Sequence, residues 1–389
     1  MMRRMADAPS RLRSVDTLRG LIMVVMALDH VGLMVGRFHS QEMWAGAWTR
    51  YDSALPFLTR FVTHFCAPGF FLLMGAGVAL LADARSRQGW PPSRTTRSIV
   101  TRGLLLMLVA TFLEVPAFLI ATLSGPPLGD NPDFAIPGGP ERRWVLTVLY
   151  ALAASMVVSG LLVRMRSAGW AVLAATALLV TAATTPGASE MTADFGFARS
   201  VLFISRWSHG VWSQYPLVPW FGIAALGVLL GRAIAADRER AYRALPWLGL
   251  ASLAVAIALR AAGGFGNLRT PRDGSWIEFL NLIKYPPSLV FTLFMVGGNL
   301  LLLAGIERVR PWTSSAGRVL ETFGRAPLAF YIAHLWLFAL IGVAWFRQGT
   351  TYGVVYAIWL AGLVPLYAVT RWFASVTAAQ PADSRWRYF

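Results

Sequence analysis

The sequence predicts an all-α fold, a polytopic membrane helical bundle with about ten transmembrane helices. Of the 389 residues, 56% are hydrophobic and 14% are charged, whereas ordinary soluble domains carry about 25% charged residues. The apolar residues form long runs, each close to the ~20 residues that cross a bilayer as a helix. Strands of a membrane barrel are much shorter than these runs, so helices are the way to satisfy the backbone in lipid.

Ten apolar runs mark the expected helices. They cover residues 17–37, 57–82, 103–124, 144–164, 169–186, 214–234, 244–262, 285–306, 325–346 and 351–373. The fourth and fifth runs are divided only by a short turn from Arg164 to Gly169. We expect a cytoplasmic N-terminal segment at 1–16, one membrane domain at 17–373 and a cytoplasmic C-terminal tail at 374–389. The longest loops, around 125–143, 187–213 and 263–284, contain Gly, Pro and aromatic residues and are expected to cap a site.

Arg and Lys residues predict the orientation. With the N-terminus placed in the cytoplasm, 22 of them fall in inner segments and 11 in outer segments. This bias predicts that both termini are cytoplasmic in a multi-pass protein of the inner (cytoplasmic) cell membrane. The net charge of +16 is spread between the apolar runs, which argues against a nucleic-acid-binding protein. The first apolar run is long and has no small-residue cleavage site after it, so we expect it to remain as a transmembrane helix. The single cysteine, Cys66, excludes an internal disulfide and a cysteine metal cluster.

The first expected helix carries three ionisable residues on one stripe. Asp16 lies one turn before Arg19, and Arg19 and His30 are about three turns, or roughly 16 Å, apart on the same face. Ionisable side chains are expensive in hydrocarbon and point to function. The structural alternative is an interfacial Asp16–Arg19 pair together with a buried polar contact at His30.

Further polar residues lie at similar depth in later helices. His64, Glu114 and His334 each interrupt an apolar run. Together with His30 they indicate a shared site, although a single membrane histidine more often forms a hydrogen bond between helices.

Two motifs mark the expected outer ends of helices. Tyr215-Pro216 precedes the sixth apolar run, and Lys284-Tyr285-Pro286-Pro287-Ser288 opens the eighth, with Lys284 as the only lysine. They are either a polar rim for an acceptor or simple helix starts with interfacial aromatic anchors.

The motif series resembles a known family. In chain order it reads Ser14-Val15-Asp16-Thr17-Leu18-Arg19-Gly20 with Asp29-His30, Thr63-His64-Phe65-Cys66-Ala67-Pro68-Gly69, Leu113-Glu114, Tyr215-Pro216 with Pro219-Trp220-Phe221-Gly222, Lys284-Tyr285-Pro286-Pro287-Ser288, and Phe323-Gly324-Arg325-Ala326-Pro327-Leu328 with Tyr331 and His334. This series, over residues 11–345, resembles bacterial membrane proteins of the heparan-α-glucosaminide N-acetyltransferase type, within the transmembrane acyltransferase superfamily. The resemblance implies transfer of an acyl group, expected to be acetyl, from cytoplasmic acyl-CoA to a sugar-like or glycan acceptor on the other side.

The resemblance, read with the polar residues, suggests roles for the candidates. We expect Arg19, with Asp16 beside it, to bind the phosphates of acetyl-CoA or another acyl-CoA. We expect His30 to act as general base or, less favoured, as an acyl-carrying nucleophile. Asp29 or Glu114 would orient His30 or balance its charge. His64 is the second candidate base, no metal is required, and the proposed acceptor-binding residues are Tyr215, Lys284, Tyr285 and His334.

The lysosomal enzyme departs from this pattern at several positions. The lysosomal member of the resembled family has Asn at the position of His30 and Asp at that of His64. Its proposed catalytic histidine falls in the loop after the first helix, where this chain has His39. The resemblance therefore predicts the fold of this chain better than it predicts which residue is the catalyst.

Two other classes of protein remain open. A proton-coupled transporter or flippase of a lipid-linked or small anionic substrate would use the same buried His and Glu as a proton relay. In a non-catalytic membrane scaffold, the polar residues would only hold helices together. A homodimer is retained as an alternative to a monomer.

Overall fold

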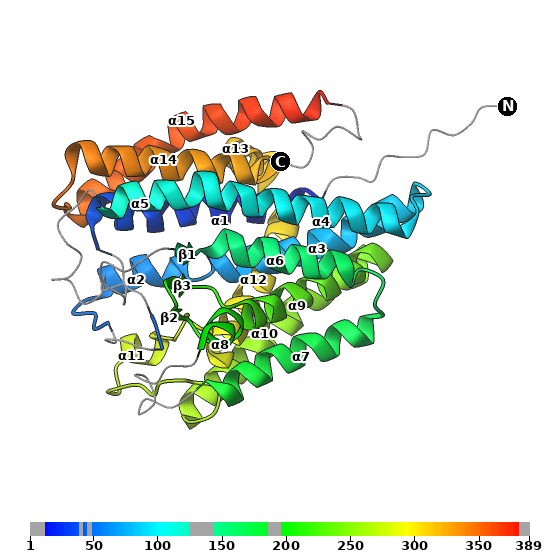
Figure 1. Cartoon of the computed structure of the whole chain (residues 1–389), viewed down its shortest axis with the longest axis horizontal. Helices are drawn as coiled ribbons and strands as arrows, with labels where there is room; N and C mark the ends of the chain where they lie inside the picture. Colours follow the sequence, from blue (N-terminus) through cyan, green and yellow to red (C-terminus); the bar gives the residue numbers. More distant parts are fainter. Residues whose placement is uncertain (1–11, 39–41, 45–48, 124–143, 186–195, 381–389) are drawn as a thin grey trace.

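The computed structural model describes residues 12–38, 42–44, 49–123, 144–185 and 196–380. Its long helices run side by side along one axis of the molecule (Figure 1). Nine helical segments of the described chain are long and apolar enough to cross a membrane. A further apolar helix, α6 (Val148–Leu161), has only 14 residues. The prediction of an all-α polytopic bundle is confirmed.

The elements follow one another with few long connections. The helical segments are α1 (Arg13–Val31), η1 (Gly32–Gly36), α2 (Ala54–Thr63), α3 (Cys66–Arg87), α4 (Pro92–Val109), η2 (Ala110–Glu114), α5 (Val115–Leu123), α6 (Val148–Leu161), α7 (Ser167–Thr184), α8 (Gly196–Leu202), α9 (Leu217–Ala236), α10 (Arg238–Ala262), α11 (Trp276–Leu280), α12 (Leu289–Val309), η6 (Pro311–Thr313), α13 (Ser315–Arg325), α14 (Pro327–Trp345) and α15 (Tyr352–Ala378). The strands are β1 (Trp144–Leu146), β2 (Arg206–Ser208) and β3 (Val211–Ser213).

The second apolar run forms two helices, because the chain breaks at His64 and Phe65 between α2 and α3. Pro68 has no N–H to donate to the carbonyl of His64, so the continuous helix loses a hydrogen bond there. The third run starts earlier than expected, at Pro92, and contains the π-helical turn η2. Such turns are frequent at functional sites.

A small sheet was not predicted. We expected helix from residue 144, but β1 pairs in parallel with β3, and β2 pairs with β3 in the antiparallel sense. The Trp-Val-Leu sequence of β1 suits a strand, and α6 begins only after Thr147. The expected 125–143 cap lies outside the described residues, as do 186–195 of the next loop.

Helix α13 packs backbone to backbone against α1. A Cβ atom at Gly20 would lie 1.8 Å from the carbonyl oxygen of Leu320, and one at Gly324 would lie 1.8 Å from that of Asp16. Only glycine permits this approach, which is typical of small residues at membrane helix contacts. The contact places α13 directly beside Arg19.

Helix α1 begins and α15 ends toward the same end of the bundle, which we call the terminal end (Figure 1). The Arg and Lys distribution predicts that this end faces the cytoplasm. Reporter fusions after Phe389 and within residues 187–213 should therefore report opposite sides of the membrane. Finding both fusions on one side would contradict the orientation.

Candidate functional site

Two histidines from distant helices meet in the bundle. The Nδ1 atom of His30, near the end of α1, lies 2.6 Å from the Nε2 atom of His334 on α14. The Nδ1 atom of His334 lies 3.0 Å from the carbonyl oxygen of Phe330. Because a carbonyl only accepts, His334 Nδ1 donates to it and His334 Nε2 accepts from His30 Nδ1. The chain of hydrogen bonds thus leaves the lone pair of His30 on Nε2, as a general base requires.

Glu114 lies next to this pair. It ends the turn η2 and is fully buried. The Tyr331 hydroxyl donates to one carboxyl oxygen at 2.6 Å, and the Thr147 hydroxyl donates to the other at 2.5 Å. The Tyr331 ring is 5.4 Å from that of His334, centroid to centroid. Tyr331 therefore joins Glu114 to the histidine pair, and we call these residues, with His30, His334 and Thr147, the His30 cluster.

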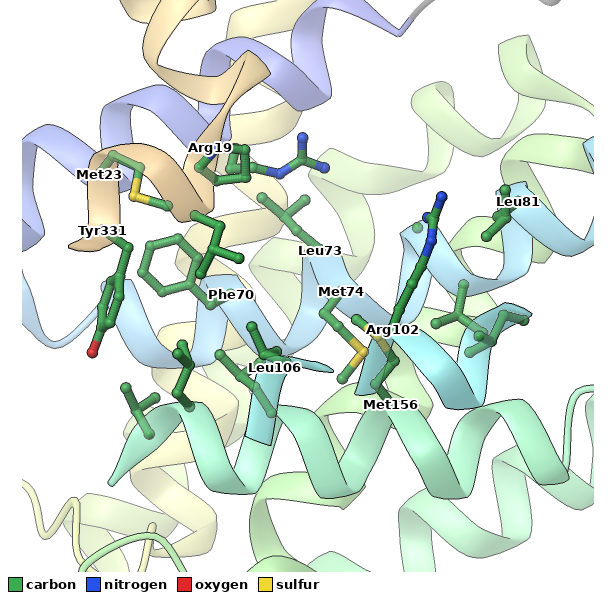
Figure 2. Close-up of a pocket in the computed structure, with 18 residues that line it drawn as sticks. Arg19, Met23, Phe70, Leu73, Met74, Leu81, Arg102, Leu106, Met156 and Tyr331 are labelled. Carbon is green, nitrogen blue, oxygen red and sulfur yellow. The ribbon is translucent and has the colours of Figure 1, made fainter. Parts of the chain in front are cut away.

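A cavity of about 320 Å³ reaches the His30 cluster from the terminal end. Its lining includes Arg19 of α1, Arg102 of α4 and Tyr331 of α14. Figure 2 shows the two arginines and, to one side, Tyr331, with Phe70 and other apolar side chains around the space between them. Two guanidinium groups suit a phosphorylated ligand, and the apolar wall suits an uncharged arm.

Arg19 is held in place by its own helix and by α13. Its Nη1 atom donates to the carboxylate of Asp16 and to the carbonyl oxygen of Gly324, both at 3.1 Å. About a quarter of its side chain stays exposed. The expected association of Asp16 with Arg19 is present.

A second polar cluster is centred on Arg60. Arg60 pairs with Asp29 at 2.5 Å and with Glu42 at 2.7 Å. The Nε2 atom of His64 lies 3.2 Å from Glu42, and the Thr63 hydroxyl donates to Asp29. Asp29 thus turns to Arg60 while its neighbour in sequence, His30, turns to His334. We call Asp29, Glu42, Arg60 and His64 the Arg60 cluster.

Glu42 is the buried carboxylate of this cluster that lies outside the membrane-spanning helices. Burial alone would oppose its ionisation, but Arg60 and then His64 outweigh this and hold the pKa of Glu42 well below its usual value. Its contribution to stability is therefore complete at neutral pH and is lost only as the pH falls through that lowered pKa.

The two aromatic motifs dock near the Arg60 cluster. The backbone N–H groups of Lys284 and Tyr285 donate to the Glu42 carbonyl oxygen, at 2.9 and 3.1 Å. The hydroxyl of Tyr285 is 3.0 Å from that of Tyr215, and the Lys284 ammonium lies 5.1 Å above the Tyr285 ring. Residues 284–288 precede α12 instead of forming its first turn, because Ser288 caps the helix by accepting from the N–H of Phe291.

The predicted site residues therefore separate into two groups. His30, Glu114 and His334 come together around Tyr331. Arg19, which pairs with Asp16, lines the cavity that also has Tyr331 in its lining. The second group contains two members of the Arg60 cluster, Asp29 and His64. It also contains three residues that adjoin this cluster: Tyr215, Lys284 and Tyr285. His39 lies outside the described residues. Over the parts of the chain with a described structure, no group of three or more His, Cys, Asp and Glu side chains is placed to hold a metal ion.

Sequence reasoning missed Arg60, Glu42, Tyr331 and Arg102 as participants. The signal for Arg60 was available, because a cation inside an apolar run needs a partner. Tyr331 also stood one helical turn before His334 in a quoted motif.

Comparison with known families fits this arrangement. Residues 11–260 match the sequence model of the catalytic domain of heparan-alpha-glucosaminide N-acetyltransferase. The chain belongs to this family. The match includes Arg19, His30, His64 and Glu114 and ends before His334. A comparison with curated proteins finds no significant match.

Membership of this N-acetyltransferase-like family gives the chain a transferase domain within a multi-pass membrane bundle.

Proposed function

We propose that the protein is an acyl-CoA-dependent membrane acyltransferase. It moves an acyl group, with acetyl as the first candidate, from cytoplasmic acyl-CoA to a hydroxyl or amine of a sugar-like acceptor at the opposite side of the membrane. One observation carries the proposal: a single cavity has two guanidinium groups in its lining and reaches Tyr331 of the His30 cluster.

The residues fit the donor in a definite order. Arg19 and Arg102 bind its phosphates with charge-assisted hydrogen bonds. The apolar wall around Phe70 and Met74 lies along the uncharged arm. This order places the thioester, which supplies the activated acyl group, toward Tyr331.

His30 performs the proton transfer. Its Nε2 takes the proton of the acceptor O–H or N–H as the acceptor atom bonds to the thioester carbonyl carbon. The C–S bond then breaks, the acyl group stays on the acceptor, and the proton passes from His30 to the departing thiolate. His334 keeps Nδ1 of His30 protonated throughout, so the basic nitrogen is always Nε2.

The proposal is tested with purified protein and radiolabelled acetyl-CoA. We expect label to appear on an amino sugar such as glucosamine and free CoA to form in equal amount. Proton-coupled flux of a substrate in liposomes, with no CoA released, would contradict the proposal and identify a transporter.

The two arginines should govern donor binding. A charge-assisted hydrogen bond contributes about 1.5–3 kcal/mol, so Arg19→Ala or Arg102→Ala should raise the dissociation constant of acyl-CoA roughly 10- to 100-fold and lower turnover less. Equilibrium binding of acetyl-CoA and steady-state kinetics check this.

Arg97→Ala is the matched control, because Arg97 is exposed on the same helix as Arg102 and does not line the cavity. Unchanged acyl-CoA affinity in a folded Arg19→Ala protein would show that Arg19 is structural and serves only its pair with Asp16.

A further inference from the structure

Arg37 lies where three parts of the bundle meet at the end opposite the terminal end. It follows η1 with a left-handed backbone, φ 58°. Its Nη1 atom donates to the carbonyl oxygen of Ala121 in the last turn of α5. Its Cβ and Cγ atoms contact Gly349 of the α14–α15 loop so closely that a Cβ there would lie 3.0 and 3.3 Å from them. The Nη1 hydrogen bond ties the guanidinium to α5, and Gly349 packs against the base of the side chain.

The other edge of this guanidinium has no acceptor within the part of the chain that the structure describes. The Nε and Nη2 atoms of Arg37 are buried and, among the described residues, have no hydrogen-bond partner. Buried polar groups are nearly always hydrogen-bonded, and an unsatisfied charged donor is expensive. Nε–H and Nη2–H point the same way, and together they form the fork that binds a carboxylate or phosphate through two parallel hydrogen bonds.

The position of Arg37 relates it to His30. Helix α5 touches both residues: Phe118 packs edge-on against the His30 ring, with centroids 5.5 Å apart, and Ala121 accepts from Arg37. Phe118 and Ala121 are three residues apart, about 4.5 Å along the helix. Arg37 therefore lies seven residues, about two helical turns, beyond His30 along α1 and η1, on the side away from Arg19.

We propose that Arg37 binds an oxyanion, a carboxylate or phosphate, carried by the acyl acceptor. The Nε–Nη2 edge holds this group while a hydroxyl or amine of the same molecule reaches His30. The acceptor assignment rests on the proposed acyl transfer, whereas the oxyanion site rests on Arg37 alone. The phosphate of a lipid headgroup has the same chemistry, and the experiment separates these two sources.

The test measures binding without acyl-CoA, so its result does not depend on catalysis. Glucose, glucuronate and glucose 6-phosphate are titrated into purified protein by calorimetry. We expect one or both anionic sugars to bind roughly ten- to hundred-fold more tightly than glucose. Arg37→Lys keeps the charge but lacks the fork, and it should remove most of this preference.

Arg347→Lys is the matched control, because Arg347 is exposed in the same loop as Gly349 and donates from Nε to Val343. It should keep the preference. Equal binding of the three sugars by the unmodified protein, or no binding of either anion, would overturn the proposal without needing a variant.

The lipid arm uses nanodiscs with and without phosphatidylglycerol. If Arg37→Lys reduces association of this lipid and leaves sugar binding unchanged, the site serves a headgroup and the acceptor assignment is wrong. If the anionic sugars bind through Arg37 but no acyl transfer occurs, the oxyanion site stands and the proposed transferase activity fails.

Discussion

His30→Gln is expected to lower the turnover number of acyl transfer by about 10²–10⁴-fold, which is the usual contribution of a positioned general base. Glutamine can still hydrogen-bond to His334, but it cannot accept a proton at neutral pH. Acyl-CoA binding should stay near normal, because Arg19 and Arg102 are not changed. Single-turnover kinetics with radiolabelled acetyl-CoA, together with equilibrium binding, measure the two effects separately.

His209→Ala provides the control, because His209 is exposed in the β2–β3 turn and contacts Ser208. It should be nearly fully active. His334→Ala should fall between the two, since it removes the partner that fixes the tautomer of His30 but leaves the base in place. Near-normal acyl transfer by His30→Gln would refute the assignment and move it to His64 or His39.

Arg60→Ala is expected to reduce the free energy of unfolding by about 3–5 kcal/mol, the usual effect of removing one partner from a buried ion pair. Arg60 is almost completely buried and pairs with both Asp29 and Glu42. Its loss leaves two carboxylates without their cation between α1, α2 and the 284–288 segment. Thermal unfolding in one detergent, followed by gel filtration, would show a much lower midpoint than for the unmodified protein.

Arg87→Ala is the matched control for charge removal. Its pair with Asp83 is exposed and should contribute at most about 1 kcal/mol. Adding Glu42→Gln to Arg60→Ala should recover part of the lost stability, because one uncompensated charge disappears. Equal midpoints for Arg60→Ala and Arg87→Ala would show that the Arg60 cluster is not a structural centre.

Much of the fold could be predicted because backbone polar groups in lipid must be hydrogen-bonded within the protein, which favours helices. Each apolar run had to become a helix, and the short turn expected after Arg164 does separate α6 from α7. The helix break at His64 was harder to predict from the sequence, although Pro68, four residues later, explains it. The strand at 144–146 depends on pairing with residues 211–213, a contact that local sequence does not reveal.

The candidate site was predictable only in part. His30, Glu114 and His334 stood out because each interrupts an apolar run, and the structure brings them together. The sequence did not predict which of these side chains contact each other. His30 and His334 are 304 residues apart and meet only because α1 packs against α14. His64 and Asp29 were expected beside His30, but the break after α2 turns this region toward Arg60 and Glu42 instead.

The most direct test of the account separates donor and acceptor across a membrane. Cell-membrane vesicles with the cytoplasmic face outward are loaded with glucosamine, washed, and given radiolabelled acetyl-CoA outside. We predict labelled acetylated sugar inside the vesicles, free CoA outside in equal amount, and neither with His30→Gln. Labelled sugar formed only when donor and acceptor share one side, or acceptor flux without CoA release, would contradict transmembrane acyl transfer.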